Sequence, residues 1–187
     1  MPSDPRFAQS QLVLPDPTDI NALAIQQQFR NLQPWGLRVH QTTIQSLVSG
    51  GFSPVSFNSQ DYNTYQSLVA SKYSLTWTAN GAYPYNILTV PQTGRYDIRA
   101  LVEVTGNSAA TTQNVAAIFI NGSFYSLGSD QFFTTVATDP VACEVNDVIK
   151  LDAGNTIVIQ IYISGVSVWA TSGRPYTRMS IGYLGPS

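Results

Sequence analysis

The chain has 187 residues, a length typical of one all-β domain with an N-terminal extension. Its charged fraction of 11% is well below the roughly 25% of an ordinary soluble domain, so Ser, Thr, Asn and Gln must cover much of the surface. A net charge of -2 and a pI near 5.1 provide no positive field for polyanions, which argues against nucleic acid and anionic membranes as partners.

The opening segment MPSDPRFAQSQLVLPDPTD lacks the basic stretch and the apolar run that together make a signal peptide. The longest apolar runs of the chain also fall short of the roughly 18 residues of a membrane span. We therefore expect a protein that is made in a cytoplasm, is not secreted by a signal peptide and does not insert into a membrane. The single cysteine, Cys143, excludes an intrachain disulfide framework, and we expect it to be a small buried strand residue.

Residues 1–50 lack the pattern of short strands that the rest of the chain shows, and they are predicted to form an N-terminal arm. Within them, Thr18 or Asp16 can cap a helix over about residues 18–33, which must end before Pro34. The apolar stripe of this helix consists of Ala22, Ile25, Phe29 and Leu32. A lone helix of this length is marginal in water, so the stripe needs a cover. The cover is the body of the domain, another copy of the chain or a larger assembly, and the sequence leaves these three open.

From residue 51 the pattern is that of short strands separated by turns. The segment GRYDIRALVEV at 94–104 alternates apolar and mostly charged residues, which is typical of a half-buried strand. Asn121-Gly122 supplies the positive φ angles of a two-residue hairpin between two further strands. The runs between turns suggest about eight to ten strands and no helix beyond residue 50, which is typical of a sandwich or barrel. The expected fold class is therefore all-β, and a jelly roll is the expected arrangement for this number of strands.

The hairpin NDVIKLDAGNTIVIQIYISG at 146–165 has a return strand that is apolar on both faces. One face is an isoleucine ladder of Ile157, Ile159, Ile161 and Ile163, and the other reads Val158, Gln160, Tyr162 and Ser164. A solvated outer face rarely carries Val and Tyr at alternate positions, so this strand is expected to have two covers. One cover is the core of the sandwich, and the other can be another subunit.

Catalytic and metal-binding patterns are weak. The only histidine, His40, lies in the predicted arm and no G-x-S-x-G elbow occurs, which disfavours a hydrolytic triad. Paired carboxylates could act on a glycan and oxygen ligands could hold calcium, but ordinary surface acids are the simpler interpretation. The candidate carboxylates are Glu103, Glu144, Asp130 and Asp139, and the candidate calcium ligands are Asp147, Asp152 and Asn155. We expect no enzyme activity, no cofactor and no metal site.

Four segments occur in the order of the C1q and tumour-necrosis-factor-like jelly rolls, and together they resemble that family. They are TVPQTGRYDIRALVEV, NVAAIFINGS, CEVNDVIKLDAGNTIVIQIYIS and MSIGYL, and SPVSF at 53–57 is similar to the strand that opens such domains. The resemblance covers about residues 51–187 and implies a jelly-roll head behind the arm. It also implies a compact homotrimer, with Val158, Tyr162 and Tyr183 close to the subunit interface.

Jelly rolls of this kind also occur in bacteriophage particles, as heads of fibres, tail or baseplate appendages and capsid decorations. The resemblance therefore suggests a non-enzymatic virion protein, anchored to other virion proteins by residues 1–50, whose head meets a host-surface glycan or protein. Trp35, Trp77 and Trp169 could stack on sugars, or they could fill the core and subunit seams. A capsid decoration protein that stabilises the shell is the alternative, and a glycan hydrolase is the third hypothesis.

Overall fold

The computed structural model describes residues 35–63, 75–80, 83–105, 112–133, 140–164, 168–170 and 176–187. The chain divides into two compact units, residues 1–33 and residues 34–187, and the described residues all belong to the second. The predicted helix over about residues 18–33 lies outside the described residues. So does its stripe of Ala22, Ile25, Phe29 and Leu32, whose anchoring role stays a prediction.

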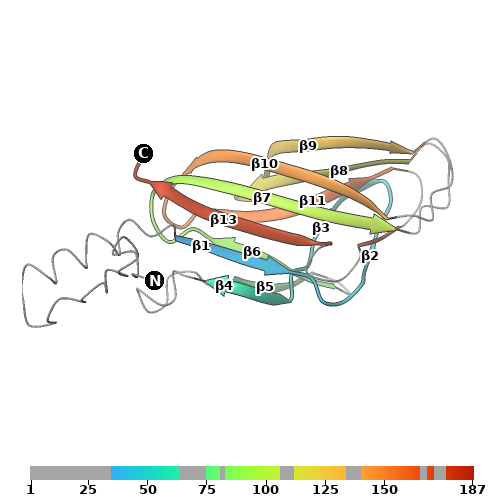
Figure 1. The fold of residues 1–187 in the computed structure, drawn as a ribbon, viewed down its shortest axis with the longest axis horizontal. Coiled ribbons are helices and arrows are strands. Elements are labelled where there is room, and N and C mark those ends of the chain that lie inside the picture. The colour runs from blue at the N-terminus through green and yellow to red at the C-terminus, as the bar shows by residue number, and fades with distance from the viewer. Residues whose placement is uncertain are drawn as a thin grey trace, which may run out of the picture. The chain divides into compact units, whose positions relative to one another are not determined.

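The described residues form two antiparallel sheets packed as a sandwich (Figure 1). Sheet A contains β1 (Trp35–His40), β2 (Gln45–Leu47), β4 (Ser59–Asn63), β7 (Gly94–Thr105), β10 (Val141–Leu151), β12 (Val168–Ala170) and β13 (Arg178–Gly185). Sheet B contains β3 (Gly51–Pro54), β5 (Leu75–Asn80), β6 (Tyr83–Thr89), β8 (Thr112–Ile120), β9 (Ser123–Phe133) and β11 (Thr156–Ile163). The all-β jelly-roll class is thereby confirmed. None of the described residues forms a helix that is long and apolar enough to cross a membrane.

Sheet A runs in the order β2-β12-β7-β13-β1-β4, and β10 pairs with β7 along its whole length. Sheet B runs in the order β5-β6-β11-β8-β9, and β3 pairs with the end of β11. Strand β11 is therefore central in its sheet, because β8 lies along one edge and β6 and β3 share the other.

The core lies between the sheets and follows the alternation of the strands. The isoleucine ladder of β11 faces inward, and each of its four side chains is at most 1% exposed, which confirms the first predicted cover. Full burial of such a side chain stabilises the fold by roughly 2 kcal/mol. From sheet A the core receives Tyr96, Ile98, Ala100, Val102 and Val104 of β7. Cys143 is also buried there, as predicted.

The prediction of an arm that reaches residue 50 is wrong for the strands β1 and β2. Strand β1 pairs with β13 on one side and with β4 on the other, so it is an internal strand of sheet A. Leu37, Val39 and Leu47 are fully buried in the core. Because these strands are short, the alternation in GLRVH is a weak signal in the sequence. The sandwich therefore begins by residue 35 and not at residue 51.

The predicted hairpin turn at Asn121-Gly122 is confirmed. The φ angles are 51° at Asn121 and 76° at Gly122, both in the left-handed region that such a turn requires. The Asn121 side chain has a second role, because its Oδ1 accepts a hydrogen bond of 2.8 Å from the amide of Thr156 at the start of β11. The tip of the β8–β9 hairpin is thereby fastened to the neighbouring strand.

The TGRY and GYL segments of the sequence meet at one end of the sandwich. The rings of Tyr96 and Tyr183 lie 5.2 Å apart at an angle of 60°, and the hydroxyl of Tyr96 donates to the carbonyl of Gln92 at 2.7 Å. The ring of Tyr183 lies directly over Gly94, where a Cβ atom would collide with it. The glycine of the TGRY segment is thus required by the tyrosine of the GYL segment.

Candidate functional site

The outer face of sheet B is the first candidate site, because the predicted interface residues Val158 and Tyr162 lie on it. In the register of the sheet, Val158 stands opposite Phe119 of β8, and Tyr162 stands between Val115 of β8 and Phe52 of β3. These side chains point away from the isoleucine ladder, as the alternation of β11 predicted.

Four rings from four strands gather on this face, and we call them the aromatic cluster: Phe52, Phe119, Phe124 and Tyr162. The Phe52 ring lies 5.2 Å from Phe119, 5.4 Å from Tyr162 and 6.2 Å from Phe124. Phe119 and Phe124 are 5.8 Å apart with nearly perpendicular planes. The pairs Phe52–Phe119 and Phe119–Phe124 have the favourable edge-to-face geometry of aromatic rings, and the other two pairs are tilted.

The aromatic cluster covers small apolar residues of the sheet beneath it. Although they lie on an outer face, Ala117 is fully buried, Val115 is nearly so, and Val158 is only 7% exposed. The second cover of β11 is therefore provided, at least in part, by rings of the same chain. Above this small second core, Phe52 remains 39% exposed and Phe124 52% exposed. An exposed apolar patch of this kind usually marks a contact surface.

The three predicted interface residues differ in what they leave at the surface. Tyr162 is half-buried and sits in the aromatic cluster, while Val158 is almost completely covered by its own chain. Tyr183 points to the inner side of β13 and packs partly buried against the core. Of the three, Tyr162 is the residue that can make a sizeable contact with another molecule. Their role in a trimer stays a prediction.

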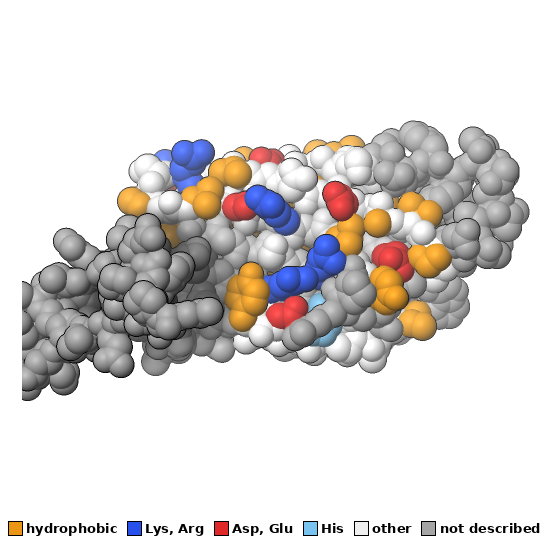
Figure 2. Space-filling view, in the orientation of Figure 1, with side chains coloured by type: hydrophobic (Ala, Val, Ile, Leu, Met, Phe, Trp, Pro, Cys, Tyr) orange, Lys and Arg blue, Asp and Glu red, His pale blue; other side chains and the backbone are white. Residues whose placement is uncertain are grey.

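The outer face of sheet A is the second candidate site, and it is charged and hollowed. Figure 2 shows Lys and Arg side chains among Asp and Glu side chains on this face. Its hollow, which we call the trough, has a volume of about 380 Å³. The charged and polar side chains that line the trough are Arg38, Tyr62, Arg99, Glu144, Asn146, Arg178 and Ser180.

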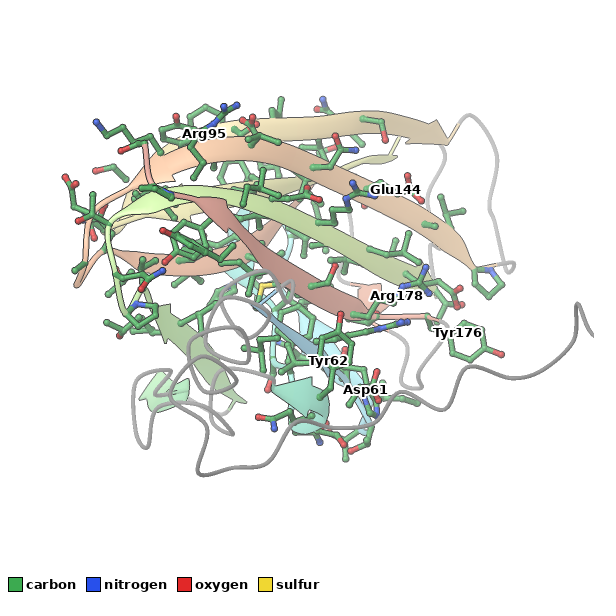
Figure 3. The ribbon with its side chains drawn as sticks, turned by 60° about the vertical axis from the view of Figure 1, so that its left-hand side comes forward. Asp61, Tyr62, Arg95, Glu144, Tyr176 and Arg178 are labelled. Carbon is green, nitrogen blue, oxygen red and sulfur yellow. The ribbon has the colours of Figure 1, made fainter. Side chains whose placement is uncertain are left out.

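The register of sheet A explains the shape of the trough. The small Ser180 of β13 stands between Arg38 of β1 and Arg99 of β7, so two long side chains flank a short one. In the next row Arg178 and Glu144 stand on either side of Leu101. Tyr62 of β4 and Arg178 of β13 lie on one side of β7, and Glu144 of β10 lies on its other side (Figure 3).

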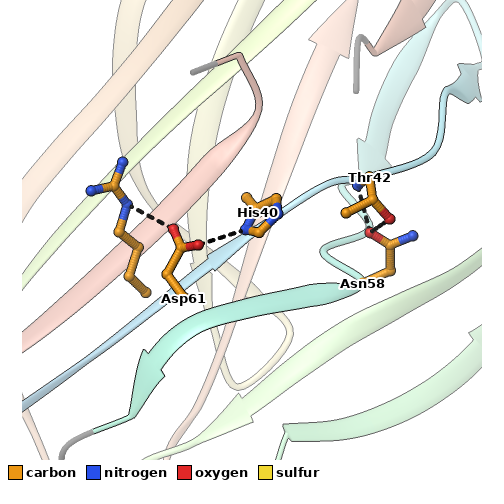
Figure 4. Close-up of polar contacts among 5 residues, drawn as sticks. His40, Thr42, Asn58 and Asp61 are labelled. Atoms are coloured by element: carbon orange, nitrogen blue, oxygen red, sulfur yellow. Dashed lines mark hydrogen bonds and ion pairs between the residues drawn. The ribbon is translucent and has the colours of Figure 1, made fainter. Parts of the chain in front are cut away.

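Ion pairs hold two of the arginines in place. Arg99 bonds to Asp97 on its own strand, with Nη2 2.9 Å from Oδ2, and this hydrogen bond and the charge of Asp97 raise the pKa of Arg99. Arg38 Nε lies 3.3 Å from Oδ2 of Asp61, whose side chain is only 9% exposed. The other oxygen of Asp61 lies 3.2 Å from Nδ1 of the buried His40 (Figure 4). Asp61 therefore ties strand β4 to β1.

The residues that the sequence offered for catalysis or metal binding are scattered. Glu144 lines the trough, Glu103 lies on β7, and Asp139 and the side chain of Asp130 lie outside the described residues. Within the described part of the chain, no three or more His, Cys, Asp and Glu residues gather as a metal site.

Two of the three residues proposed for calcium, Asp147 and Asn155, use a side-chain oxygen in a contact within the chain. Asp147 Oδ1 accepts a hydrogen bond from the amide of Val148 at 2.7 Å. Asn155 Oδ1 accepts one from the amide of Asp152 at 2.9 Å. These bonds are those of ordinary turn and strand residues. Trp35, Trp77 and Trp169 belong to strands β1, β5 and β12, but the placement of their side chains lies outside the description.

Comparisons with solved structures identify the architecture. A TNF structure, Eiger from S. frugiperda, superimposes with a TM-score of 0.60 at 12% identity, covering 82% of this chain and 94% of that one. Murine APRIL gives a TM-score of 0.53 at 15% identity, covering 81% of this chain and all of the other. No protein-family model matches the sequence, and no curated protein matches it. At these identities the likeness establishes a TNF-like jelly-roll fold, as the sequence motifs predicted.

Proposed function

We propose that the protein is a non-enzymatic, homotrimeric structural protein of a phage particle, held by its N-terminal residues and exposing the sandwich to the host surface. The observation that carries the proposal is a TNF-like sandwich whose two outer faces differ in chemistry. One face is charged and hollowed, and the other is aromatic, with one charged residue in its strands. Two such faces suit two different contacts.

In this proposal the outer face of sheet A makes the contact with a second and a third copy, in place of the predicted contact through Val158 and Tyr162 on sheet B. Val158 is only 7% exposed and offers a partner little surface. The trough carries both signs of charge, so a neighbouring copy can present complementary side chains to it. Leu101 and the 47% exposed Val148 add apolar surface to the same face. At Gly182 of β13 no atom of the described residues lies within 4 Å of a potential Cβ atom, so a neighbouring copy can approach the backbone closely there. A threefold arrangement is what the resemblance to TNF-like jelly rolls implies.

The virion role is supported by the composition and by the fold together. A chain with 11% charged residues, a jelly-roll head and a separate unit of residues 1–33 suits a particle component whose first unit binds other virion proteins. The outer face of sheet B then remains available for a host glycan or protein.

The mass of the full-length protein in solution tests the trimer. Size-exclusion chromatography with light scattering is expected to give three times the 20.4 kDa of one chain at micromolar concentration. A monomer or a dimer under these conditions contradicts the proposal.

Antibody labelling of phage particles that carry the chain tests the location. Few copies at the tail, with loss of adsorption when the protein is absent, are the expected result. Many copies over the shell, with loss of shell stability, would instead identify a capsid decoration protein.

A further inference from the structure

The two sheets of the sandwich divide the charged residues very unequally. Strands β3, β5, β6, β8 and β11 contain no Asp, Glu, Lys or Arg, and β9 contains only Asp130. Sheet A, in contrast, carries Arg38, Asp61, Arg95, Asp97, Arg99, Glu103, Glu144, Asp147, Lys150 and Arg178. A ligand of sheet B therefore meets almost no formal charge on the sheet.

The missing charges narrow the class of ligand that this face can bind. Nucleic acid requires cations against its phosphates, and anionic lipid headgroups require them as well. An acidic peptide would lose the hydration of its charges against these strands and gain no ion pair, and a basic peptide would find a single acidic residue in them. The chemistry that remains is a neutral molecule with both apolar and hydrogen-bonding surface.

The exposed parts of the aromatic cluster supply both kinds of contact. Phe124 and Phe52 are large apolar rings with 52% and 39% of their surface open. Tyr162 brings a phenol hydroxyl into the cluster. Gln160 places an amide on the same face of β11, between Pro54 of β3 and Ala117 of β8.

A neutral sugar matches this pattern. One face of a pyranose presents C–H groups that pack on an aromatic ring, while its hydroxyls pair with phenol and amide groups at the edge. The rings are also held before any ligand arrives, because each contacts other rings of the cluster and the cluster closes over buried Ala117. Little side-chain freedom is then lost on binding.

We propose that the outer face of sheet B is a binding site for a neutral glycan, whose sugar rings stack on Phe124 and Phe52. The inference rests on the proposed exposure of the sandwich to a host surface. An acidic polysaccharide is not the expected ligand, since the strands of sheet B contain no Lys or Arg to pair with it.

The test uses full-length protein and two sets of oligosaccharides. Titration calorimetry and saturation-transfer NMR are carried out with neutral hexamers of glucose, mannose and N-acetylglucosamine, and with a hexamer of galacturonate as the charged counterpart. We expect binding of at least one neutral hexamer, saturation of its ring C–H protons, and no loss of affinity when the salt concentration is raised. No binding of any neutral hexamer overturns the proposal, as does binding of galacturonate alone.

Matched variants locate the binding to the aromatic cluster. F124A is expected to weaken binding by about tenfold or more, a loss of about 1.4 kcal/mol, and F124W to retain it. I44A removes a comparably exposed apolar side chain between β1 and β2, away from the aromatic cluster, and is expected to change nothing. Thermal unfolding confirms that each variant is folded. Equal binding by F124A and the wild type overturns the site.

Light scattering on the same samples separates this inference from the proposed trimer. A monomer that binds the neutral sugar through Phe124 would contradict the trimer and keep the site. A trimer that binds no neutral sugar would keep the trimer and remove the site. If F124A dissociates the trimer, the aromatic cluster is a subunit contact and the glycan proposal is wrong.

Discussion

Gly94 shows how one residue without a side chain joins two distant parts of the chain. A Cβ atom at this position would collide with the ring of Tyr183 and would lie 2.6 Å from the carbonyl oxygen of Gly185. We expect G94A to lower the free energy of unfolding by about 1–3 kcal/mol, the usual cost of overpacking. Urea denaturation measures this.

The matched control is G51A at the start of β3. No described residue has an atom within 4 Å of a Cβ atom at Gly51, so its free energy of unfolding should stay within about 0.5 kcal/mol of the wild type. Equal stabilities of G94A and G51A would show that the ring of Tyr183 moves away from Gly94 at no cost.

Among the strands, β11 is expected to be the most sensitive to substitution, because one of its faces lies in the core of the sandwich and the other lies under the aromatic cluster. Ile161 is fully buried and belongs to the ladder that the inner core surrounds. I161A is expected to lower the free energy of unfolding by about 2–5 kcal/mol, through lost burial and the cavity that remains. V148A, on the exposed face of β10, should cost far less. Chemical denaturation of both variants at one protein concentration checks the difference, and similar losses would contradict the assignment of the ladder to the core.

Strand β1 should be required for folding, because the sandwich begins with it. A fragment of residues 51–187 lacks β1 and β2, so β13 loses a hydrogen-bonded neighbour and the core loses Leu37, Val39 and Leu47. We expect this fragment to be insoluble or unfolded by circular dichroism, whereas residues 34–187 should fold. A folded, soluble 51–187 fragment would show that β1 is dispensable.

Features of these strands that depend on neighbouring residues could be predicted from the sequence, whereas contacts between distant strands could not. The hairpin at Asn121-Gly122 and the isoleucine ladder were predictable, because local turn chemistry and alternation over neighbouring residues determine them. The aromatic cluster was not, since Phe52 and Phe124 meet only when β3 and β9 fold onto the same face. The contact between Asp61 and Arg38 depends on strand pairing in the same way, and the short β1 concealed it.

In our proposal the molecule uses the outer face of sheet A for contact between copies and the outer face of sheet B for glycan binding. A substitution on one face should therefore leave the function of the other face intact. Gly182 lies on the outer face of β13, about 7 Å along the strand from Ser180 in the trough. None of the described residues has an atom within 4 Å of a Cβ atom at Gly182, but an arginine there would stand where a neighbouring copy approaches.

We therefore expect G182R to remain folded and to shift the protein from trimer to monomer at micromolar concentration, as measured by light scattering. S123R is its control, because it adds the same charge at the exposed end of the β8–β9 hairpin, away from the trough. The monomeric G182R should still bind a single neutral oligosaccharide with the wild-type affinity per site, since the aromatic cluster lies on the other sheet. It should lose the avidity that three linked sites give on a glycan-coated surface. A trimeric, folded G182R would place the contact between copies elsewhere on the sandwich.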